Sequence, residues 1–136
     1  MIQNTTFAMI KPDAYENASE ITNFIVQHRF HISHLEATGS MTQENARWLY
    51  GEHEHKPFFE ELVEFTCSGP VVLLGIQAPF AVDTFRRLLG PTDWREADKS
   101  TIRGRFAKGP RIMENAMHGS ADDVAAREEL NHFFGA

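Results

Sequence analysis

Short apolar runs and amphipathic stretches take turns along this chain. Thr5–Ile10 is a mostly apolar run that stops at Lys11 and Pro12, and Val71–Ile76 is a second such run. Runs of this length are typical of buried strands, and because proline cannot donate to a ladder, the first strand is expected to end at Lys11. Ile32–Ser40 mixes polar and apolar positions in the alternation of a third strand.

Apolar side chains at helical spacing predict the helices. The predicted segments run from Ser19, a possible N-cap, to His28, from Thr42 to Tyr50, from Phe58 to Phe65, from Phe80 to Leu89 and from Val124 to Phe134. Residues 90 to 114 lack an apolar period and contain several glycines and prolines, so a long functional loop is expected there. A last short strand, Asn115–His118, follows this loop.

The order of these elements predicts an α+β fold. It matches a ferredoxin-like split β-α-β sandwich, in which a four-stranded antiparallel sheet is covered by helices packed on one side. At 136 residues, with 42% hydrophobic and 24% charged residues, the chain fits a single domain over residues 1–136.

Composition also limits the cellular setting. No apolar stretch approaches the ~20 residues that a membrane helix needs, and the first residues lack a secretory n-region, so no membrane partner and a cytoplasmic location are expected. Cys67 is the only cysteine, which excludes an internal disulfide.

Charge is unevenly distributed along the chain. The net charge is −6, yet residues 86 to 111 hold eight of the thirteen basic residues against three acidic ones, a local charge of +5. Such a cluster is commonly a solvated face or an interface, and a phosphate-binding wall is the alternative. A nucleic-acid-binding module could use the same segment, but the acidic total and the lack of interleaved aromatic residues argue against nucleic acid as a partner.

One of the seven histidines stands apart from the others. Five of them are predicted to be surface residues, because their spacing does not suit metal chelation on a helix: His28, His31, His34, His53 and His55. His118 instead ends an apolar segment just before Gly119 and Ser120, where a side chain can project into a cleft. The Ser120 hydroxyl could hydrogen-bond an incoming group.

The segment Asn115-Ala116-Met117-His118-Gly119-Ser120 resembles the N-x-x-H-G-S motif of the nucleoside diphosphate kinase family. Companion segments occur in the family's order: Ile10-Lys11-Pro12-Asp13, Lys56-Pro57-Phe58-Phe59, Leu62-Val63, Ser68-Gly69-Pro70-Val71, Leu88-Leu89-Gly90, Thr101-Ile102-Arg103-Gly104 and Phe133-Phe134-Gly135. The resemblance covers nearly the whole chain.

This resemblance implies a ping-pong phosphoryl transfer between nucleoside di- and triphosphates. His118 would attack the γ-phosphate of a triphosphate, typically ATP, hold it as phosphohistidine and return it to another diphosphate. A nucleophilic imidazole needs a group that accepts a hydrogen bond from its other nitrogen. Glu129 matches the family residue in that role, and its neighbour Glu128 is the alternative.

The resemblance also assigns the nucleotide contacts. Lys11, Arg86, Thr92 and Arg103 match phosphate-contacting positions, Tyr50 a tyrosine near the phosphoryl group, Asn115 a sugar contact, Phe58 the aromatic on which the base stacks, and Leu62 and Ile112 further nucleotide-binding positions. Arg86 is preferred over Arg87 because it lies four residues before Gly90, as in the family. Without the resemblance, Phe58 would be assigned to the core.

The same resemblance leads to expectations about metal binding and oligomeric assembly. Mg²⁺ is expected to bind mainly through the nucleotide phosphates, since the acidic residues lack the spacing of a metal cage, and Glu52 could contact its waters. The family forms tetramers or hexamers, so a homo-oligomer is expected.

Three features depart from the family pattern. Ala121 stands where an aspartate is usual, Thr92-Asp93-Trp94 replaces Thr-Asn-Pro, and the stretch from Phe106 to Asn115 is about two residues longer than in typical members. A catalytically impaired member acting as an oligomeric binding or scaffold protein is therefore the competing hypothesis. The retention of His118 favours the kinase.

Overall fold

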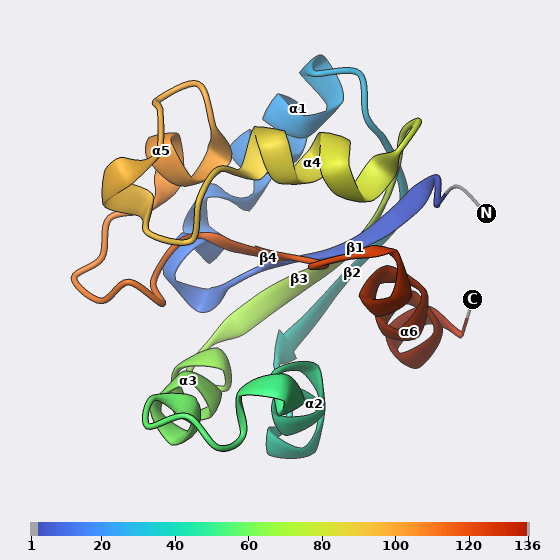
Figure 1. Cartoon of the computed structure of the whole chain (residues 1–136). Coiled ribbons are helices and arrows are strands. Elements are labelled where there is room, and N and C mark those ends of the chain that lie inside the picture. Colours follow the sequence, from blue (N-terminus) through green and yellow to red (C-terminus); the bar gives the residue numbers. More distant parts are fainter. Residues whose placement is uncertain (1–2, 136) are drawn as a thin grey trace.

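The computed structural model describes residues 3–135 and folds them into one four-stranded antiparallel sheet flanked by helices (Figure 1). The strands are β1 (Thr5–Ile10), β2 (His31–Ser40), β3 (Pro70–Gln77) and β4 (Met117–Gly119). Their order in the sheet is β2-β3-β1-β4, which confirms the ferredoxin-like α+β prediction. Between residues 3 and 135, no helix is both long enough and apolar enough to cross a bilayer.

Six α-helices occur in the described part of the chain and cover both faces of the sheet. They are α1 (Ala18–Gln27), α2 (Gln43–Leu49), α3 (Phe59–Thr66), α4 (Ala81–Leu89), α5 (Ile102–Phe106) and α6 (Asp123–Phe134). In Figure 1, α1, α4 and α5 lie on one side of the strands and α2, α3 and α6 on the other. The prediction that the helices pack on one side is therefore wrong.

Strand β1 explains why both faces are covered. Phe7 and Met9 pack into a core with α2, α3 and α6, whereas Ala8 and Ile10 pack into a second core with α1, α4 and α5. Successive side chains of a strand point to opposite faces, so a strand covered on both sides is apolar throughout. The continuous apolar run that predicted β1 therefore arises because each face of the strand packs into its own core.

The helix starts use side-chain caps at three places. The Thr42 hydroxyl accepts from the Asn45 N–H at 3.2 Å. Asp122 caps α6 and Thr101 caps α5 in the same way. The cap predicted at Ser19 is wrong, because α1 begins at Ala18, one residue earlier.

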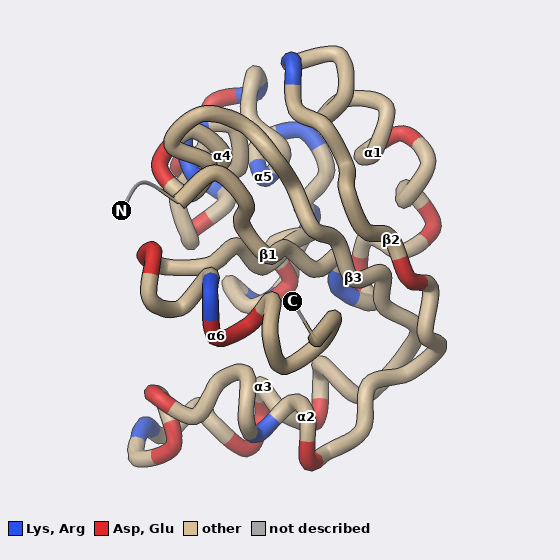
Figure 2. The backbone as a smooth tube through the Cα atoms, turned by 90° about the vertical axis from the view of Figure 1, so that its right-hand side faces the viewer, with Lys and Arg blue, Asp and Glu red and all other residues tan. Residues whose placement is uncertain are grey.

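The segment from residue 90 to residue 114 is more structured than expected. It holds a 3₁₀ turn, Trp94–Glu96, and the short helix α5. Helix α5 has five residues, and only Ile102 and Phe106 supply its apolar face, which is too little for a periodic signal. Figure 2 shows the basic residues of this part of the chain gathered around α4 and α5.

Truncation of a central side chain tests the double core. Leu74 lies fully buried in β3, so Leu74→Ala should lower the free energy of unfolding by about 2–5 kcal/mol. Val124 is 55% exposed on α6, so Val124→Ala should change it by less than about 0.5 kcal/mol. Urea unfolding followed by circular dichroism measures both, and equal losses would contradict this assignment of the core.

Candidate active site

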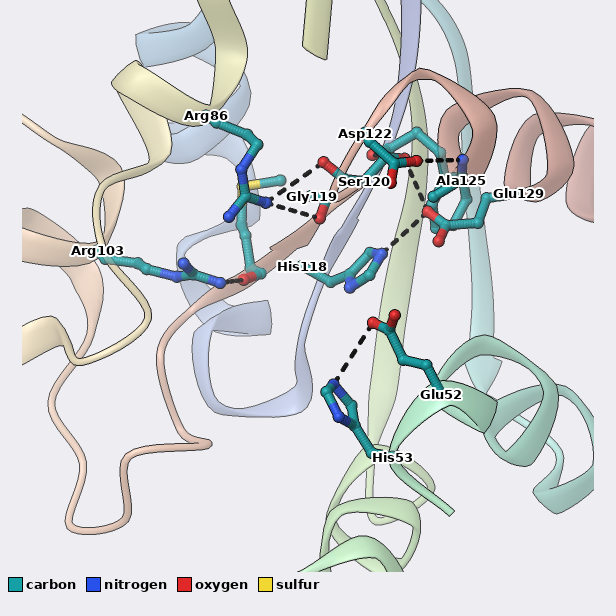
Figure 3. Close-up of polar contacts among 12 residues, drawn as sticks. Glu52, His53, Arg86, Arg103, His118, Gly119, Ser120, Asp122, Ala125 and Glu129 are labelled. Carbon is teal, nitrogen blue, oxygen red and sulfur yellow. Dashed lines mark hydrogen bonds and ion pairs between the residues drawn. The ribbon is translucent and has the colours of Figure 1, made fainter. Parts of the chain in front are cut away.

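His118 occupies the centre of β4, opposite Met9 of β1. Its side chain is 14% exposed, and its Nε2 atom lies 3.1 Å from Oε1 of Glu129 on α6 (Figure 3). Strand pairing therefore fixes the backbone of His118, and helix α6, which follows this strand in the chain, orients its ring. Glu129, and not Glu128, makes this contact.

Ser120 supports the same carboxylate from behind. Its hydroxyl donates to Oε1 of Glu129 at 2.7 Å, and its backbone N–H donates to the Phe7 carbonyl of β1 at 3.1 Å. Both Ser120 and Glu129 are buried. The carboxylate is thus held by two partners, which limits the orientations that it can offer to His118.

The contact with Glu129 determines which ring nitrogen of His118 is free. An ionised carboxylate only accepts hydrogen bonds, so Nε2 carries the proton and Nδ1 keeps its lone pair. Figure 3 shows the second ring nitrogen directed away from Glu129. The ring of Tyr50 packs edge-on against the imidazole at 5.6 Å between centroids, which further restricts rotation. The ring is therefore held in one orientation, with Nε2 bonded to Glu129 and Nδ1 directed away from it.

Two basic side chains near His118 are almost completely buried. Lys11 is 4% exposed and Arg103 is 6% exposed. The Lys11 ammonium donates to Oδ1 of Asn115 at 3.0 Å and to the Met113 carbonyl at 3.2 Å. The Arg103 guanidinium donates to the Met117 carbonyl at 2.8 Å. These partners are neutral oxygens and not carboxylates.

Arg86 completes a group of three cations. Its Nη1 atom lies 3.3 Å from the Ser120 carbonyl and 3.4 Å from the Gly119 carbonyl, at the end of the strand that carries His118 (Figure 3). Throughout residues 3–135, the ion pairs of the protein involve other side chains and leave Lys11, Arg86 and Arg103 without a carboxylate. Buried charges need partners, so an anion is the expected occupant.

The protonation equilibria of these groups reflect their burial. Desolvation, together with the nearby Arg103, lowers the pKa of Lys11 to about 7, and Asp13 opposes the shift. Burial, with a smaller contribution from Arg86, lowers the pKa of Arg103 to about 10. Burial also raises the pKa of Tyr50 above its ordinary value. The site is thus a low-dielectric pocket in which an anion would restore full charge on Lys11.

Asp13 does not line the cavity but supports the segment before His118, a role that the sequence reasoning did not assign. Its Oδ2 atom accepts from the Ala116 N–H at 3.0 Å, and the Ala116 carbonyl accepts from the Lys11 N–H at 2.9 Å. Ala116 has φ +76°, a conformation that costs a non-glycine residue about 1–3 kcal/mol and that its surroundings must hold. Burial raises the pKa of Asp13. Its place in the Lys11-Pro12-Asp13 segment, which matches the family, was the signal in the sequence that could have identified it.

A cavity of about 940 Å³ collects almost all of the residues expected at the site. The expected residues that line it are Lys11, Tyr50, Glu52, Phe58, Leu62, Arg86, Thr92, Arg103, Ile112, Asn115, His118 and Glu129. Ser120 is buried behind Glu129 and is not part of the lining. Segments that lie far apart in the sequence therefore converge on the cavity that contains His118.

Phe58 and Ile112 lie at the outer part of this cavity. They are 41% and 45% exposed, so neither is a core residue. The assignment of Phe58 to the core, which its sequence pattern alone would favour, is therefore wrong. Exposed apolar side chains beside buried cations suit a ligand that has a flat apolar end and an anionic end.

Several lining residues were missed by the sequence reasoning. They include Trp48, Glu61, Arg111, Met113 and His53. His53 had been assigned to the surface, but its side chain is 28% exposed and its Nδ1 atom is buried. Glu61 and Arg111 lie 50 residues apart, and no local pattern could have brought them together.

The acidic residues near the cavity bear on metal binding. Within residues 3–135, no group of three His, Cys, Asp or Glu side chains is arranged to hold a metal ion. Glu52 lines the cavity with a largely exposed side chain, 3.6 Å from Nε2 of His53. Ala121 also lines the cavity and offers no oxygen ligand. Such a wall fits a hard cation that is brought in by a phosphate ligand and keeps its waters.

Comparison with known proteins places this arrangement in context. The family model described as nucleoside diphosphate kinase matches residues 4–136. The nucleoside diphosphate kinase of Lawsonia intracellularis is 41% identical over 133 residues, which are 96% of this chain and 94% of that protein. The nucleoside diphosphate kinase of Saccharolobus solfataricus is 38% identical over 136 residues, 98% of this chain and 96% of that protein.

Solved structures agree with these matches. The structure of the Aquifex aeolicus nucleoside diphosphate kinase superposes with a TM-score of 0.91 at 34% identity and covers 96% of this chain and 94% of that one. The structure of a halophilic nucleoside diphosphate kinase from Halobacterium salinarum in complex with CDP gives a TM-score of 0.89 at 32% identity, covering 98% of this chain and 90% of that one.

The pKa of Lys11 can be measured directly, because the chain has four lysines. In protein labelled with ¹³C at lysine Cε, the resonance that disappears in Lys11→Arg should titrate with a midpoint at about 7. Sulfate should move this midpoint upward by at least about one unit, since a bound anion favours the charged amine. A midpoint near the ordinary lysine value in sulfate-free buffer would contradict the burial of the Lys11 ammonium without an ion pair.

Proposed function

Because the chain belongs to the nucleoside diphosphate kinase family and is a nucleoside diphosphate kinase, we propose that its phosphoryl transfer passes through a phosphohistidine on His118. One observation supports this most strongly. The Nε2 atom of His118 is held by Glu129, and the cavity also contains Lys11, Arg86 and Arg103, which form no ion pair within residues 3–135. Nucleophile, orienting base and phosphate-binding groups are thus present in one site.

In the first half-reaction, the Nδ1 lone pair attacks the γ-phosphorus of a nucleoside triphosphate such as ATP. A bond forms from Nδ1 to phosphorus, and the bond to the bridging oxygen breaks, so the diphosphate leaves with that oxygen. The imidazole gains positive character during this step. The Glu129 carboxylate, held by Ser120, stabilises that charge through the Nε2 proton.

Lys11, Arg86 and Arg103 stabilise the charge that spreads over the transferred phosphoryl oxygens. All three line the cavity, and their hydrogen-bond acceptors among residues 3–135 are neutral oxygens. They are therefore positioned before the substrate arrives, and little reorganisation accompanies the reaction. Tyr50 packs against His118 and keeps the ring aimed at this group.

The nucleoside end of the substrate occupies the outer part of the cavity. Phe58 and Ile112 receive the two faces of the base, and Leu62 lies deeper on the same side. Stacking uses the π-surface that every base has, so broad nucleotide specificity follows. Asn115, which donates to the Thr92 carbonyl and accepts from Lys11, contacts the sugar, and Thr92 contacts phosphate.

After the first diphosphate leaves, a second one enters the same pocket. Its terminal phosphate oxygen attacks the phosphorus on His118, the bond to Nδ1 breaks, and Nδ1 regains its lone pair. Mg²⁺ is proposed to accompany the nucleotide, bound mainly through phosphate oxygens, and to neutralise their charge. Glu52 lies where it could accept hydrogen bonds from the waters of the ion, while Ala121 contributes no such contact.

Residues 1–136 are proposed to act as one kinase domain that assembles into a homo-oligomer, a tetramer or a hexamer, in the cytoplasm. The free thiol of Cys67 is compatible with a reducing compartment. The competing hypothesis was a catalytically impaired scaffold. The intact contacts of His118, Glu129 and Ser120 favour an active enzyme instead.

Transfer of label from ATP tests the phosphohistidine. Incubation with ATP labelled at the γ-phosphate should leave acid-labile, base-stable label on the protein, because a phosphorus–nitrogen bond has that stability. The label should leave when a nucleoside diphosphate is added. His118→Ala should stay unlabelled, whereas His55→Ala, which alters an exposed histidine outside the cavity, should be labelled like the wild type. Labelled His118→Ala would refute the mechanism.

A further inference from the structure

Arg111 makes a bridge across one end of the cavity. Its Nη1 atom donates to Oε2 of Glu61 on α3 at 2.7 Å, and its Nε atom donates to Oε2 of Glu114 at 2.8 Å. The guanidinium also lies 5.2 Å from the centre of the Phe65 ring on α3. We refer to Arg111, Glu61 and Glu114 as the Arg111 bridge.

The bridge joins two parts of the cavity lining, one next to Phe58 and the other next to Ile112. Phe58 directly precedes α3, the helix that carries Glu61, and Ile112 directly follows Arg111. Phe58, Glu61, Arg111 and Ile112 all line the same cavity. The distance between the two apolar side chains therefore depends on how firmly the loop before β4 is tied to α3.

Among the hydrogen bonds of residues 3–135, the one from Arg111 to Glu61 joins this part of the loop to α3, and Met113 packs against the core to which α3 contributes. The backbone N–H of Arg111 donates to Glu114 at 3.2 Å, and the Glu114 N–H donates to the Arg111 carbonyl at 3.0 Å, so these two residues close a local turn. The Met113 carbonyl accepts from Lys11 at the opposite end of the turn. Arg111 is the residue of this turn that reaches across to Glu61 and Phe65.

We propose that Arg111 is a positioning residue for nucleotide binding: bonded to Glu61 and Glu114, it sets the width of the slot between Phe58 and Ile112 that receives the base. The inference rests on the proposed function, because it presumes that a nucleotide occupies the cavity. In this proposal, Arg111 affects binding by positioning neighbouring residues and does not contact the phosphate groups of the nucleotide. The bridge acts on the base end of the ligand and leaves the phosphate end unchanged.

A simpler account makes Arg111 just another positive charge that attracts an anionic ligand. The two accounts predict opposite effects at Glu61. Removal of a negative charge beside the cavity should strengthen the binding of every polyanion if charge alone matters. If the bridge sets the slot, removal of Glu61 releases the loop and weakens the binding of ligands that have a base.

The chain supplies a matched control on the same helix. Glu60 lies next to Glu61 on α3 and forms a two-pronged bond with Arg47, at 2.7 and 2.8 Å, while Arg47 lies 5.2 Å from the Phe59 ring. Neither Glu60 nor Arg47 lines the cavity. Glu60→Ala and Arg47→Gln therefore remove a similar bridge and the same charges without touching the slot.

The test compares Glu61→Ala and Arg111→Gln with those two controls, using ADP and pyrophosphate as ligands in calorimetric titrations. An exposed pair contributes up to about 1 kcal/mol, or about fivefold in affinity. Glu61→Ala and Arg111→Gln should each raise the dissociation constant of ADP about fivefold. In Glu61→Ala, pyrophosphate should bind within about twofold of the wild type. The double variant should show less than the sum of the two single effects, because both remove one bridge.

Steady-state kinetics with ATP provide a second readout. The KM should rise in Glu61→Ala while kcat stays within about twofold, since the reacting groups are untouched. Tighter binding of both ligands in Glu61→Ala would support the charge account and overturn the bridge. Binding equal to that of Glu60→Ala would overturn it as well. Phosphohistidine labelling of the wild type is independent of these outcomes, so its absence would refute the proposed function, whereas failure at Glu61 alone would refute only the inference.

Discussion

The burial of positive charge without a matching carboxylate is the constraint on which this site depends. Lys11 and Arg103 are nearly inaccessible, and in the part of the chain that the structure describes they donate only to carbonyl and amide oxygens. Such burial is unfavourable, as the lowered pKa of Lys11 reflects. Burial of these charges lowers the stability of the fold, and the binding of an anion offsets this cost. Affinity for phosphate and a cost in stability are therefore two aspects of one arrangement.

The sheet and the segments next to it provide the backbone carbonyls that accept hydrogen bonds from these basic side chains. Lys11 follows the last residue of β1, and Arg103 and Arg86 donate to carbonyls at and next to β4. The same two strands fix His118, and Ser120 returns to β1 through the Phe7 carbonyl. A change in the pairing of β1 with β4 would therefore displace His118 and the basic side chains together. This shared support explains how a strand of three residues can hold His118 in place.

Much of the site could be predicted, but for different reasons in different places. The strand end at Lys11 follows from the apolar run and the proline behind it, and His118 follows from its place before Gly119. The roles of Arg86 and Phe58 came from the family resemblance, since their own surroundings in sequence suggested a helix surface and a core. Asp13, which holds the strained Ala116, went unassigned because nothing local shows that a loop 103 residues away needs a hydrogen-bond acceptor.

What the sequence by itself determined is the order of the strands and helices and the presence of a histidine motif, because apolar periods, prolines and caps act over a few neighbouring residues. Only the tertiary structure decided that helices cover both faces of the sheet, since an apolar strand does not reveal what covers it. It also shows that Glu129, which the resemblance favours, is the glutamate in contact with His118, and it alone joins Arg111 to Glu61. These pairings depend on how separate elements pack, and side chains that are 50 residues apart meet only after the sheet has formed.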